Sequence, residues 1–497
     1  MGLTVGEIRD RAERFRASVL EEVYEARAGR KSWPELASLH EAQGILKFDR
    51  IIPIIERDLA ASDGDDERRL RRLRQWAADH HLRSANARLD DEYALWVSTA
   101  TVPVDGSELP IRQANAIIEA TGDRNVRRRF DDARNAVLEE GAALQLERLS
   151  RWRAAAEELG YGDYREAAER LAGLSLTGLQ RQARRLVVET EDVYREHLGW
   201  LLRSRLGVGT EDAEGHDADW LTRMKWLDGS WDETSLLRLV TRDLTDIGLP
   251  LAIAGRVNVE HETFPGPGMQ AFCAPIVVPD RINLLVTPTA TQPGCTALLA
   301  EIGKALHWAY TDPRLPFEYR AVGDLAVVEA HGAIFAGLAR SRPWSRRVRG
   351  FGAEELSDYL RLVAFVDLYW LRKAAARLQF DLELAASDRP ESMGPRWAEL
   401  VREATGFRVD PRGCFEQLGQ RFGVARWIRA RMLAAQIRRV LRDRFDDDWY
   451  RNPRTGPFLG DWFAEGLRWN AAELAGRVGA DRLGADELLS SVREGLA

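Results

Sequence analysis

Cysteine is scarce in this 497-residue chain, which contains only Cys273, Cys295 and Cys414. The number is odd and no pair has the Cys-x-x-Cys spacing, so the sequence predicts neither a disulfide framework nor a structural zinc site. Free thiols suit a reducing compartment. Residues 1–10 also carry acidic residues where a signal peptide has basic residues followed by an apolar core. We therefore expect a cytoplasmic protein.

Long hydrophobic runs and flexible linkers are both missing. No apolar run approaches the roughly 20 residues that a helix needs to cross a bilayer, so we expect no membrane partner. No Pro/Ser/Gly-rich tract divides the chain, and its 45% apolar residues can build a sizeable core. The sequence therefore predicts an N-terminal helical region at 1–245 and a second region at 246–497, intertwined as one unit.

Lysine is rare as well, because the basic residues are overwhelmingly arginine. Lysine occurs only at positions 31, 47, 225, 304 and 373, whereas Lys and Arg together number 71. In such a background, a lysine at position 304 favours a role for the ammonium group itself. The formal net charge of −7 argues against nucleic acid as the main partner.

Helical periodicity is abundant. Apolar residues recur every three to four positions over most of the chain, as in residues 5–28. β-branched residues and glycine mark the first strand at 251–259, and a further strand follows at 281–287. We therefore expect a mainly α fold with one small sheet. An acidic loop at 209–219 contains a His-Asp pair at 216–217, which fits capping of the next helix better than a metal site.

Residues 298–310 resemble a zinc-peptidase helix whose metal ligands have been exchanged. In an intact His-Glu-x-x-His motif, two His on one helix face bind zinc, and the Glu polarises the metal-bound water. Here Glu301 is present, but the two His positions hold Ala300 and Lys304. Alanine has no donor atom and a protonated amine repels a dication. Two of the three protein ligands of a catalytic zinc are therefore missing.

The segments around this helix carry the same likeness. A turn-rich, strand-like run at 265–287 precedes it, and Val-Glu-Ala-His-Gly follows at 328–332. This order resembles the gluzincin metallopeptidases, specifically the oligopeptidase group of thimet-type (M3) and angiotensin-converting-type (M2) enzymes. The runs 271–275, 315–320 and 460–466 are similar to bacterial M3-like sequences, and the likeness is strong from residue 160 onward.

The resemblance implies a mainly α, two-lobed gluzincin-like helical shell with a deep central channel and one small β-sheet next to the active-site helix. Position by position, Ala300 and Lys304 match the two zinc-ligand His. Glu301 matches the catalytic Glu, and Glu329 matches the third zinc ligand. The region 246–497 is then catalytic-like, but we expect neither a metal nor another cofactor in it.

The candidate catalytic group is Glu301, Lys304 and Glu329. Two facing carboxylates without a cation would repel each other, whereas an ammonium group between them favours ionisation of both. Lys304 is thus a candidate charge substitute for zinc. The alternative is a weak, exposed ion pair between Glu301 and Lys304 at i, i+3 on a helix.

Candidate ligand-binding residues surround this group. A helix that often carries a transition-state-stabilising Tyr in the family has none here at 427–430. The strand at 281–287 matches the edge strand that pairs with substrate backbone in gluzincins, and strand addition does not need a metal. The ligand-binding candidates are His307, Trp308, His331, Trp427, Arg429 and Asn283.

Three functions remain open. The first is a non-catalytic pseudopeptidase that binds a peptide or small amino-acyl ligand, or that scaffolds partners. The second is a metal-independent enzyme in which Lys304 acts as acid/base or nucleophile, tuned by Glu301 and Glu329. The third is a residual zinc metallopeptidase that uses Glu301, Glu329 and a nearby His. The sequence leaves the oligomeric state open.

Overall fold

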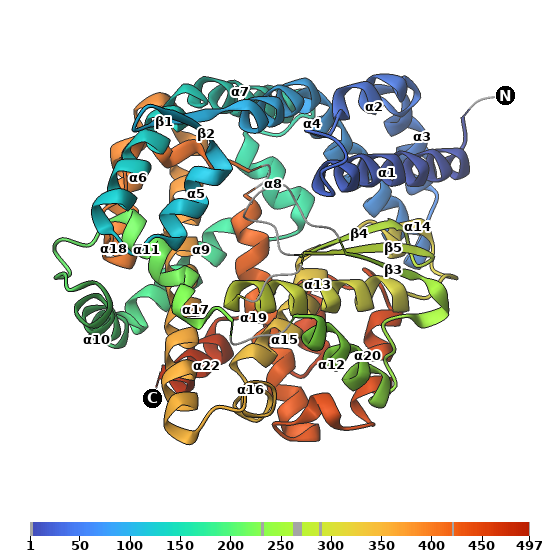
Figure 1. Ribbon diagram of the computed structural model, residues 1–497. Coiled ribbons are helices and arrows are strands. Elements are labelled where there is room, and N and C mark those ends of the chain that lie inside the picture. The colour runs from blue at the N-terminus through green and yellow to red at the C-terminus, as the bar shows by residue number, and fades with distance from the viewer. Residues whose placement is uncertain (1–2, 230–232, 262–270, 288–290, 420–421, 497) are drawn as a thin grey trace.

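The structure is a computed structural model that describes residues 3–229, 233–261, 271–287, 291–419 and 422–496. It is mainly helical, with an arc of helices from α4 to α7 above a larger body that contains α13, α15 and α19 (Figure 1). The helices before residue 250 are α1 (Val5–Arg27), α2 (Leu36–Ala42), α3 (Phe48–Ala60), α4 (Gly64–Thr99), α5 (Ile111–Ala120), α6 (Arg124–Glu140), α7 (Ala142–Glu158), α8 (Tyr164–Ala172), α9 (Leu176–Glu189), α10 (Glu191–Leu201), α11 (Gly215–Arg223) and α12 (Glu233–Asp246).

The second half holds the remaining helices and the main sheet. The helices are α13 (Gln292–Tyr310), α14 (Phe317–Arg320), α15 (Ala326–Ala336), α16 (Arg342–Arg349), α17 (Ala353–Ala386), α18 (Gly394–Thr405), α19 (Gly423–Phe445), α20 (Thr455–Ala464), α21 (Ala471–Arg477) and α22 (Asp486–Leu496). The strands are β1 (Thr101–Val104), β2 (Ser107–Pro110), β3 (Val257–His261), β4 (Ala271–Val277) and β5 (Arg281–Val286). A 3₁₀ turn, η5 (Gly337–Arg340), continues α15.

The sequence of α1 explains both where this helix begins and which of its faces is buried. Thr4 caps its N-terminus, because the Thr4 hydroxyl accepts from the backbone N–H of Glu7 and the Glu7 carboxylate accepts from the backbone N–H of Thr4. The apolar positions Ile8, Ala12 and Phe15 then share one buried face at helical spacing. That face packs against α3 and α4.

The main sheet has three strands in the order β3-β5-β4. β5 pairs with β3 in parallel and with β4 in antiparallel orientation. Helix α13 packs on one face, which carries Cys273 and Leu284, and α1 packs on the other, which carries Ala274 and Leu285. Figure 1 shows the sheet between α1 above and α13 below. This two-sided cover explains why both faces of β4 and β5 are apolar.

Three sequence expectations about strands are wrong. The strand at 281–287 is not an edge strand, because β5 lies in the centre of the sheet and β3 and β4 form its two edges. The strand expected at 251–259 begins only at Val257, because a 3₁₀ turn occupies 253–255. Nor is this sheet the only one in the described residues, because β1 and β2 form a hairpin. Its turn is Asp105-Gly106, both with positive φ, a dipeptide typical of a two-residue hairpin turn.

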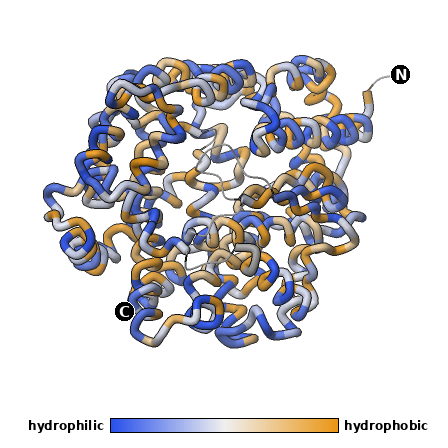
Figure 2. Tube along the Cα trace, viewed as in Figure 1, coloured by the Kyte–Doolittle hydropathy of each residue, from blue (hydrophilic) through white to orange (hydrophobic). Residues whose placement is uncertain are grey.

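Two large hydrophobic cores hold the body together. One core joins α7 to α11 with α17, α18, α19 and α22, so it draws on segments far apart in the chain. The other joins α12, the sheet, α13, α15, α19, α20 and α21. Figure 2 shows hydrophobic and hydrophilic residues side by side along the helices of the outer arc, as expected for helices with one buried face. Within the described ranges, no helix has the length and hydropathy needed to span a bilayer.

Helices α13 and α15 approach closely at a pair of glycines. A Cβ atom on Gly303 would lie 2.7 Å from the carbonyl oxygen of His331 and 2.9 Å from the Cα of Gly332. A Cβ atom on Gly332 would lie 2.7 Å from the carbonyl oxygen of Ala300. Real Cβ atoms do not approach backbone this closely, so the helix pair requires glycine at both positions.

We expect Gly303→Ala to lower the free energy of unfolding by about 1–3 kcal/mol, because the added methyl group must separate α13 from α15. The matched control is Gly476→Ala in α21, where a Cβ would meet open space. That variant should be neutral or up to about 1 kcal/mol more stable, because Ala is the better helix former. Urea unfolding of both variants measures the difference, and equal stabilities would contradict the tight packing.

Candidate functional site

Helix α13 presents one partly exposed stripe to the site. It begins at a Thr291 cap, whose hydroxyl accepts from the N–H of Gly294 at 3.0 Å. Between residues 297 and 309, only Ala297, Ala300, Glu301 and Lys304 are partly exposed, and all others are buried. The spacing i, i+3, i+4, i+7 places these four on one face of the helix. The positions predicted to match the zinc motif, 300, 301 and 304, therefore lie together on the face of α13 that is open to solvent.

Glu301 and Lys304 contact each other directly. Nζ of Lys304 donates to Oε1 of Glu301 at 2.6 Å, and Oε2 of Glu301 accepts from the backbone N–H of Cys273 at 2.9 Å. Both carboxylate oxygens are thus engaged. The stem of Lys304 lies against α15, because a Cβ on Gly332 would be 3.1 Å from its Cγ. The glycine contact between the helices therefore also makes room for the lysine.

Glu329 is held by a residue that the sequence analysis missed. Nε of Arg426 on α19 lies 2.6 Å from Oε1 of Glu329. The Arg426 side chain is 43% exposed and that of Glu329 is 23% exposed, so this pair borders solvent. The one signal of Arg426 in the sequence is that it stands next to the predicted ligand-binding residues Trp427 and Arg429. The sequence contains no local cue that pairs positions 97 residues apart.

The environment of Lys304 keeps it protonated. Burial alone lowers its pKa, but the charge and hydrogen bond of Glu301 and the charge of Glu329 outweigh burial and raise the pKa above its usual value. A catalytic lysine that acts as base or nucleophile needs the opposite shift, toward neutral pH. The arrangement therefore fits a fixed positive charge better than a reactive amine.

The sequence resemblance to gluzincins implies zinc, and the donor atoms of this chain do not fit that metal. Ala300 offers none, and Lys304 places a cation where a ligand would stand. Among the described residues, the only group of three or more His, Cys, Asp or Glu side chains close enough to share an ion is Glu214, His216 and Asp217. Glu301 and Glu329 therefore have no His positioned to complete a site with them.

His307 and His331 form a buried pair behind the site. Their Nδ1 atoms lie 2.9 Å apart, and both side chains are at most 1% exposed. Burial, with a contribution from His331, holds the pKa of His307 well below its usual range, and burial lowers the pKa of His331 to about 3. Both imidazoles are neutral, so one Nδ1 donates to the other. The pair links α13 to α15 within the packed interior.

The other candidates have contacts of their own. Trp308 is buried beneath the guanidinium of Arg16. Trp427 lies against the core and under Arg431. Nη1 of Arg429 donates to Asp324 at 3.0 Å, and Asp324 also accepts from the N–H of Ala471, so Arg429 joins α19 to the start of α21. Asn283 is partly buried in the central strand β5. The structure thus brings together Glu301, Lys304 and Glu329, and adds Arg426.

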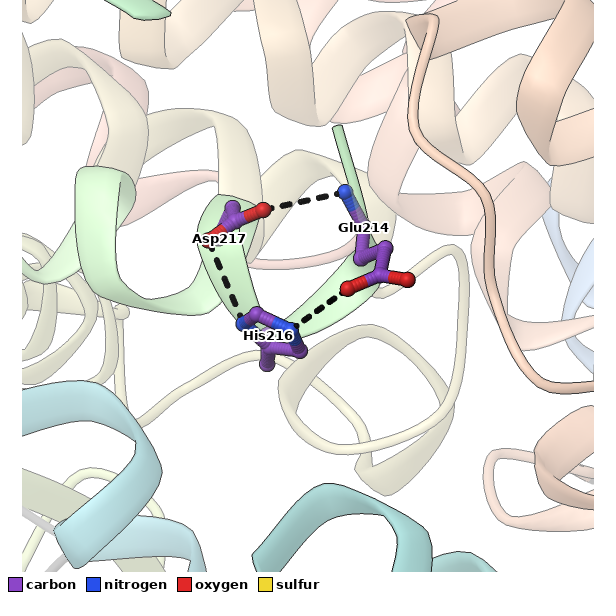
Figure 3. A group of neighbouring side chains, drawn as sticks. All are labelled: Glu214, His216 and Asp217. Atoms are coloured by element: carbon purple, nitrogen blue, oxygen red, sulfur yellow. Dashed lines mark hydrogen bonds and ion pairs between the residues drawn. The ribbon is translucent and has the colours of Figure 1, made fainter. Parts of the chain in front are cut away.

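The Glu214, His216 and Asp217 cluster is an arginine-bound cap of α11 (Figure 3). Glu214 and Asp217 form a capping box at the helix start, which confirms the capping role expected for this segment. His216 lies 3.0 Å from Glu214 and 3.2 Å from Asp217. Four arginines also bind the two acids, namely Arg124, Arg127, Arg128 and Arg408. With more cations than carboxylates, the cluster repels a metal ion.

A cavity of about 1030 Å³ lies away from this site. It is lined by α10 and α18, with four arginines and four glutamates in its walls: Arg195, Arg203, Arg402, Arg408, Glu196, Glu211, Glu399 and Glu403. The opposite charges balance, so the cavity favours neither cations nor anions. We assign it no part in the chemistry of Lys304.

Comparisons with known proteins show the fold. No protein-family model and no curated protein matches the chain. All of it aligns with 97% of the solved structure of PZ peptidase A with inhibitor 2, with a TM-score of 0.64 and 15% sequence identity. This likeness confirms the mainly α fold, and at 15% identity it shows the fold alone.

We expect Lys304→Met to lower the free energy of unfolding by about 1–2 kcal/mol, because Glu301 and Glu329 lose a shared countercharge in a partly buried site. Lys304→Arg keeps the charge and should remain closer to the parent in stability. Urea unfolding at neutral pH measures both. Adding Glu301→Gln to Lys304→Met should recover part of the loss, because it removes one uncompensated carboxylate. A Met variant as stable as the parent would favour the weak, exposed ion pair.

The buried histidine pair predicts acid sensitivity. Because the folded-state pKa values lie below the unfolded value of about 6.5, the unfolded state binds protons that the folded state does not, and stability falls as pH drops below that value. Each histidine contributes a slope of up to about 1.4 kcal/mol per pH unit. We expect His331→Asn to reduce the slope of the free energy of unfolding against pH between pH 6.5 and 4.5 by the contribution of one histidine, and urea unfolding at several pH values measures it. The control His261→Asn, at an exposed position in β3, should leave the slope unchanged.

Proposed function

We propose that this chain is an M3-like peptidase homologue that no longer hydrolyses peptides with zinc and instead binds a peptide or small amino-acyl ligand at the former active site. One observation carries the proposal. Nζ of Lys304 donates to Glu301. In the resemblance, Lys304 matches a zinc ligand and Glu301 matches the glutamate that acts on the metal-bound water. Lys304 supplies positive charge in place of a metal, but it cannot act as a Lewis acid that activates water.

The remaining groups support the loss of hydrolysis. A zinc ion lowers the pKa of bound water to about 7, whereas ammonium and guanidinium groups provide no such Lewis acid. Glu301 cannot serve as a free base while its two oxygens are bound by Lys304 and by the Cys273 N–H. At positions 427–430 no Tyr is present to stabilise an oxyanion.

The edge strand β4 supports ligand binding. The N–H of Cys273 points away from β5, because it donates to Glu301 and not to the sheet. Two residues further along the same edge, the carbonyl of Pro275 accepts from Arg16 at 3.0 Å. A peptide carbonyl could therefore take the Cys273 N–H when the carboxylate of Glu301 turns wholly toward Lys304. The substrate-pairing strand is then β4, in place of the strand at 281–287.

Metal analysis and a restoration experiment test the loss of zinc. We expect the purified parent to contain less than about 0.1 equivalent of zinc, because two ligands are missing. The variant Ala300→His/Lys304→His restores both ligands beside Glu329 and should bind about one equivalent. The matched control Ala300→His keeps the ammonium of Lys304 and should bind little. Stoichiometric zinc in the parent, removed by chelator together with peptidase activity, would overturn the proposal.

Hydrogen exchange tests the binding role in the same preparations. We expect a mixture of short unstructured peptides to slow exchange of the backbone amides in β4 and the first turns of α13, without cleavage of the peptides. Protection confined to other segments, or none at all, would argue that the former active site binds no peptide. A mass spectrum of the peptide mixture after incubation detects residual hydrolysis.

A further inference from the structure

A second group of charged residues lies where η5, α17 and α19 meet. Arg340 ends η5, Asp367 lies on α17, and Arg431 and Arg438 lie on α19. Nη1 of Arg340 is 2.8 Å from Oδ1 of Asp367, and Nη2 of Arg431 donates to the same carboxylate. One carboxylate thus serves two guanidinium groups, and a third lies beside them.

Arg438 completes the cluster and has no acidic partner in it. Its Nη1 donates to the carbonyl oxygen of Ala333 at 3.3 Å. The guanidinium lies against Gly337, where a Cβ would come within 2.6 Å of Nη1. Burial, together with repulsion from Arg340 and Arg431, lowers the pKa of Arg438 to about 9. At neutral pH all three arginines stay charged, so the cluster keeps two positive charges in excess of Asp367.

Unused donors remain inside this cluster. Nη2 of Arg340 and Nε of Arg431 are buried, and neither has a hydrogen-bond partner among the described residues. The Arg431 side chain is only 9% exposed, whereas Arg340 and Asp367 keep 19% and 18% of their side chains open to solvent. Buried like charges without a partner are unfavourable, and buried donors normally find acceptors. The partial opening gives a small ion a route from solvent.

We propose that Arg340, Arg431 and Arg438 form a binding site for a dianionic tetrahedral oxyanion of the phosphate class. Two negative charges match the excess positive charge, and the oxygens of such an ion accept from several guanidinium donors at once. The site is distinct from that of Lys304, because its residues pair with Asp367 and not with Glu329. Along α19, Arg431 and Arg438 lie about 8 Å and 18 Å beyond Arg426. The site would join the end of α15 to α17 and α19 through one shared ligand.

Calorimetry and thermal melting at constant ionic strength test the site. The full-length parent in sodium gluconate is titrated with inorganic phosphate, sulfate, chloride or glycerol phosphate. We expect phosphate and sulfate to bind and to raise the melting temperature with concentration, as mass action requires. Chloride should act much more weakly because it carries one charge. If glycerol phosphate also binds, the site accepts phosphoryl groups of larger molecules. If only phosphate and sulfate bind, the site is specific for the free ion.

Arg438→Gln is the decisive variant, because it leaves Asp367 paired with Arg340 and Arg431. We expect it to weaken phosphate binding at least about tenfold, by loss of charge-assisted hydrogen bonds, and to melt higher than the parent in gluconate, because repulsion is relieved. The control is Arg439→Gln, whose parent side chain is 40% exposed and pairs with Glu487. It should retain the phosphate response.

Other outcomes overturn the site. If phosphate and sulfate neither bind to the parent protein nor raise its melting temperature, the proposed site is contradicted. Equal responses in the parent, Arg438→Gln and Arg439→Gln show general screening only. Should Arg438→Gln fail to fold, Arg438→Lys provides the same comparison, since it keeps the charge but not the guanidinium fork. We expect weaker but detectable binding by Arg438→Lys, and an unchanged affinity would contradict recognition by Arg438.

Discussion

The close approach of α13 and α15 at Gly303 and Gly332 determines where the groups of the site lie. Because no Cβ separates the helices, the backbone of Ala300 meets α15, and the stem of Lys304 lies over Gly332. The same approach sets the Nδ1 atoms of His307 and His331 2.9 Å apart. A helix pair held this rigidly can keep charged groups in fixed positions at the edge of a core.

The electrostatic consequence is a balanced group of four. Glu301 and Glu329 each contribute one negative charge, and Lys304 and Arg426 each contribute one positive charge, so the sum is zero. A zinc ion with two glutamates would reach the same sum. The balance explains how two partly buried carboxylates remain acceptable without a metal. The Glu301–Lys304 pair lies within α13, whereas the Glu329–Arg426 pair joins α15 to α19. The charge of Glu329 also acts on Lys304, so the four groups form one polar site.

Contacts between residues close in the sequence could be predicted from it, whereas contacts between distant residues could not. The zinc-like motif located α13 and the contact of Glu301 with Lys304, because residues three apart on a helix are neighbours. The pairing of Glu329 with Arg426 joins helices 97 residues apart and has no local signature. The prediction that 281–287 is an edge strand was wrong for the same reason. The central place of β5 depends on its pairing with both β3 and β4, and the sequence of β5 alone does not show those partners. The β1–β2 hairpin differs, because its Asp-Gly turn was visible but stood among strong helical signals.

In the function that we propose, side-chain cations stand in place of a metal, and this difference changes what the site can do. A zinc ion has an open coordination position that activates water, whereas an ammonium group only donates hydrogen bonds. Lys304 uses one of its donors on Glu301 and has others for a ligand carbonyl or carboxylate. Arg426, at 43% exposure, is the most exposed of the four side chains, so an incoming carboxylate can reach its guanidinium group from solvent. Because the donors of Lys304 and Arg426 are charged but cannot activate water, the proposed site favours binding of a ligand over its cleavage.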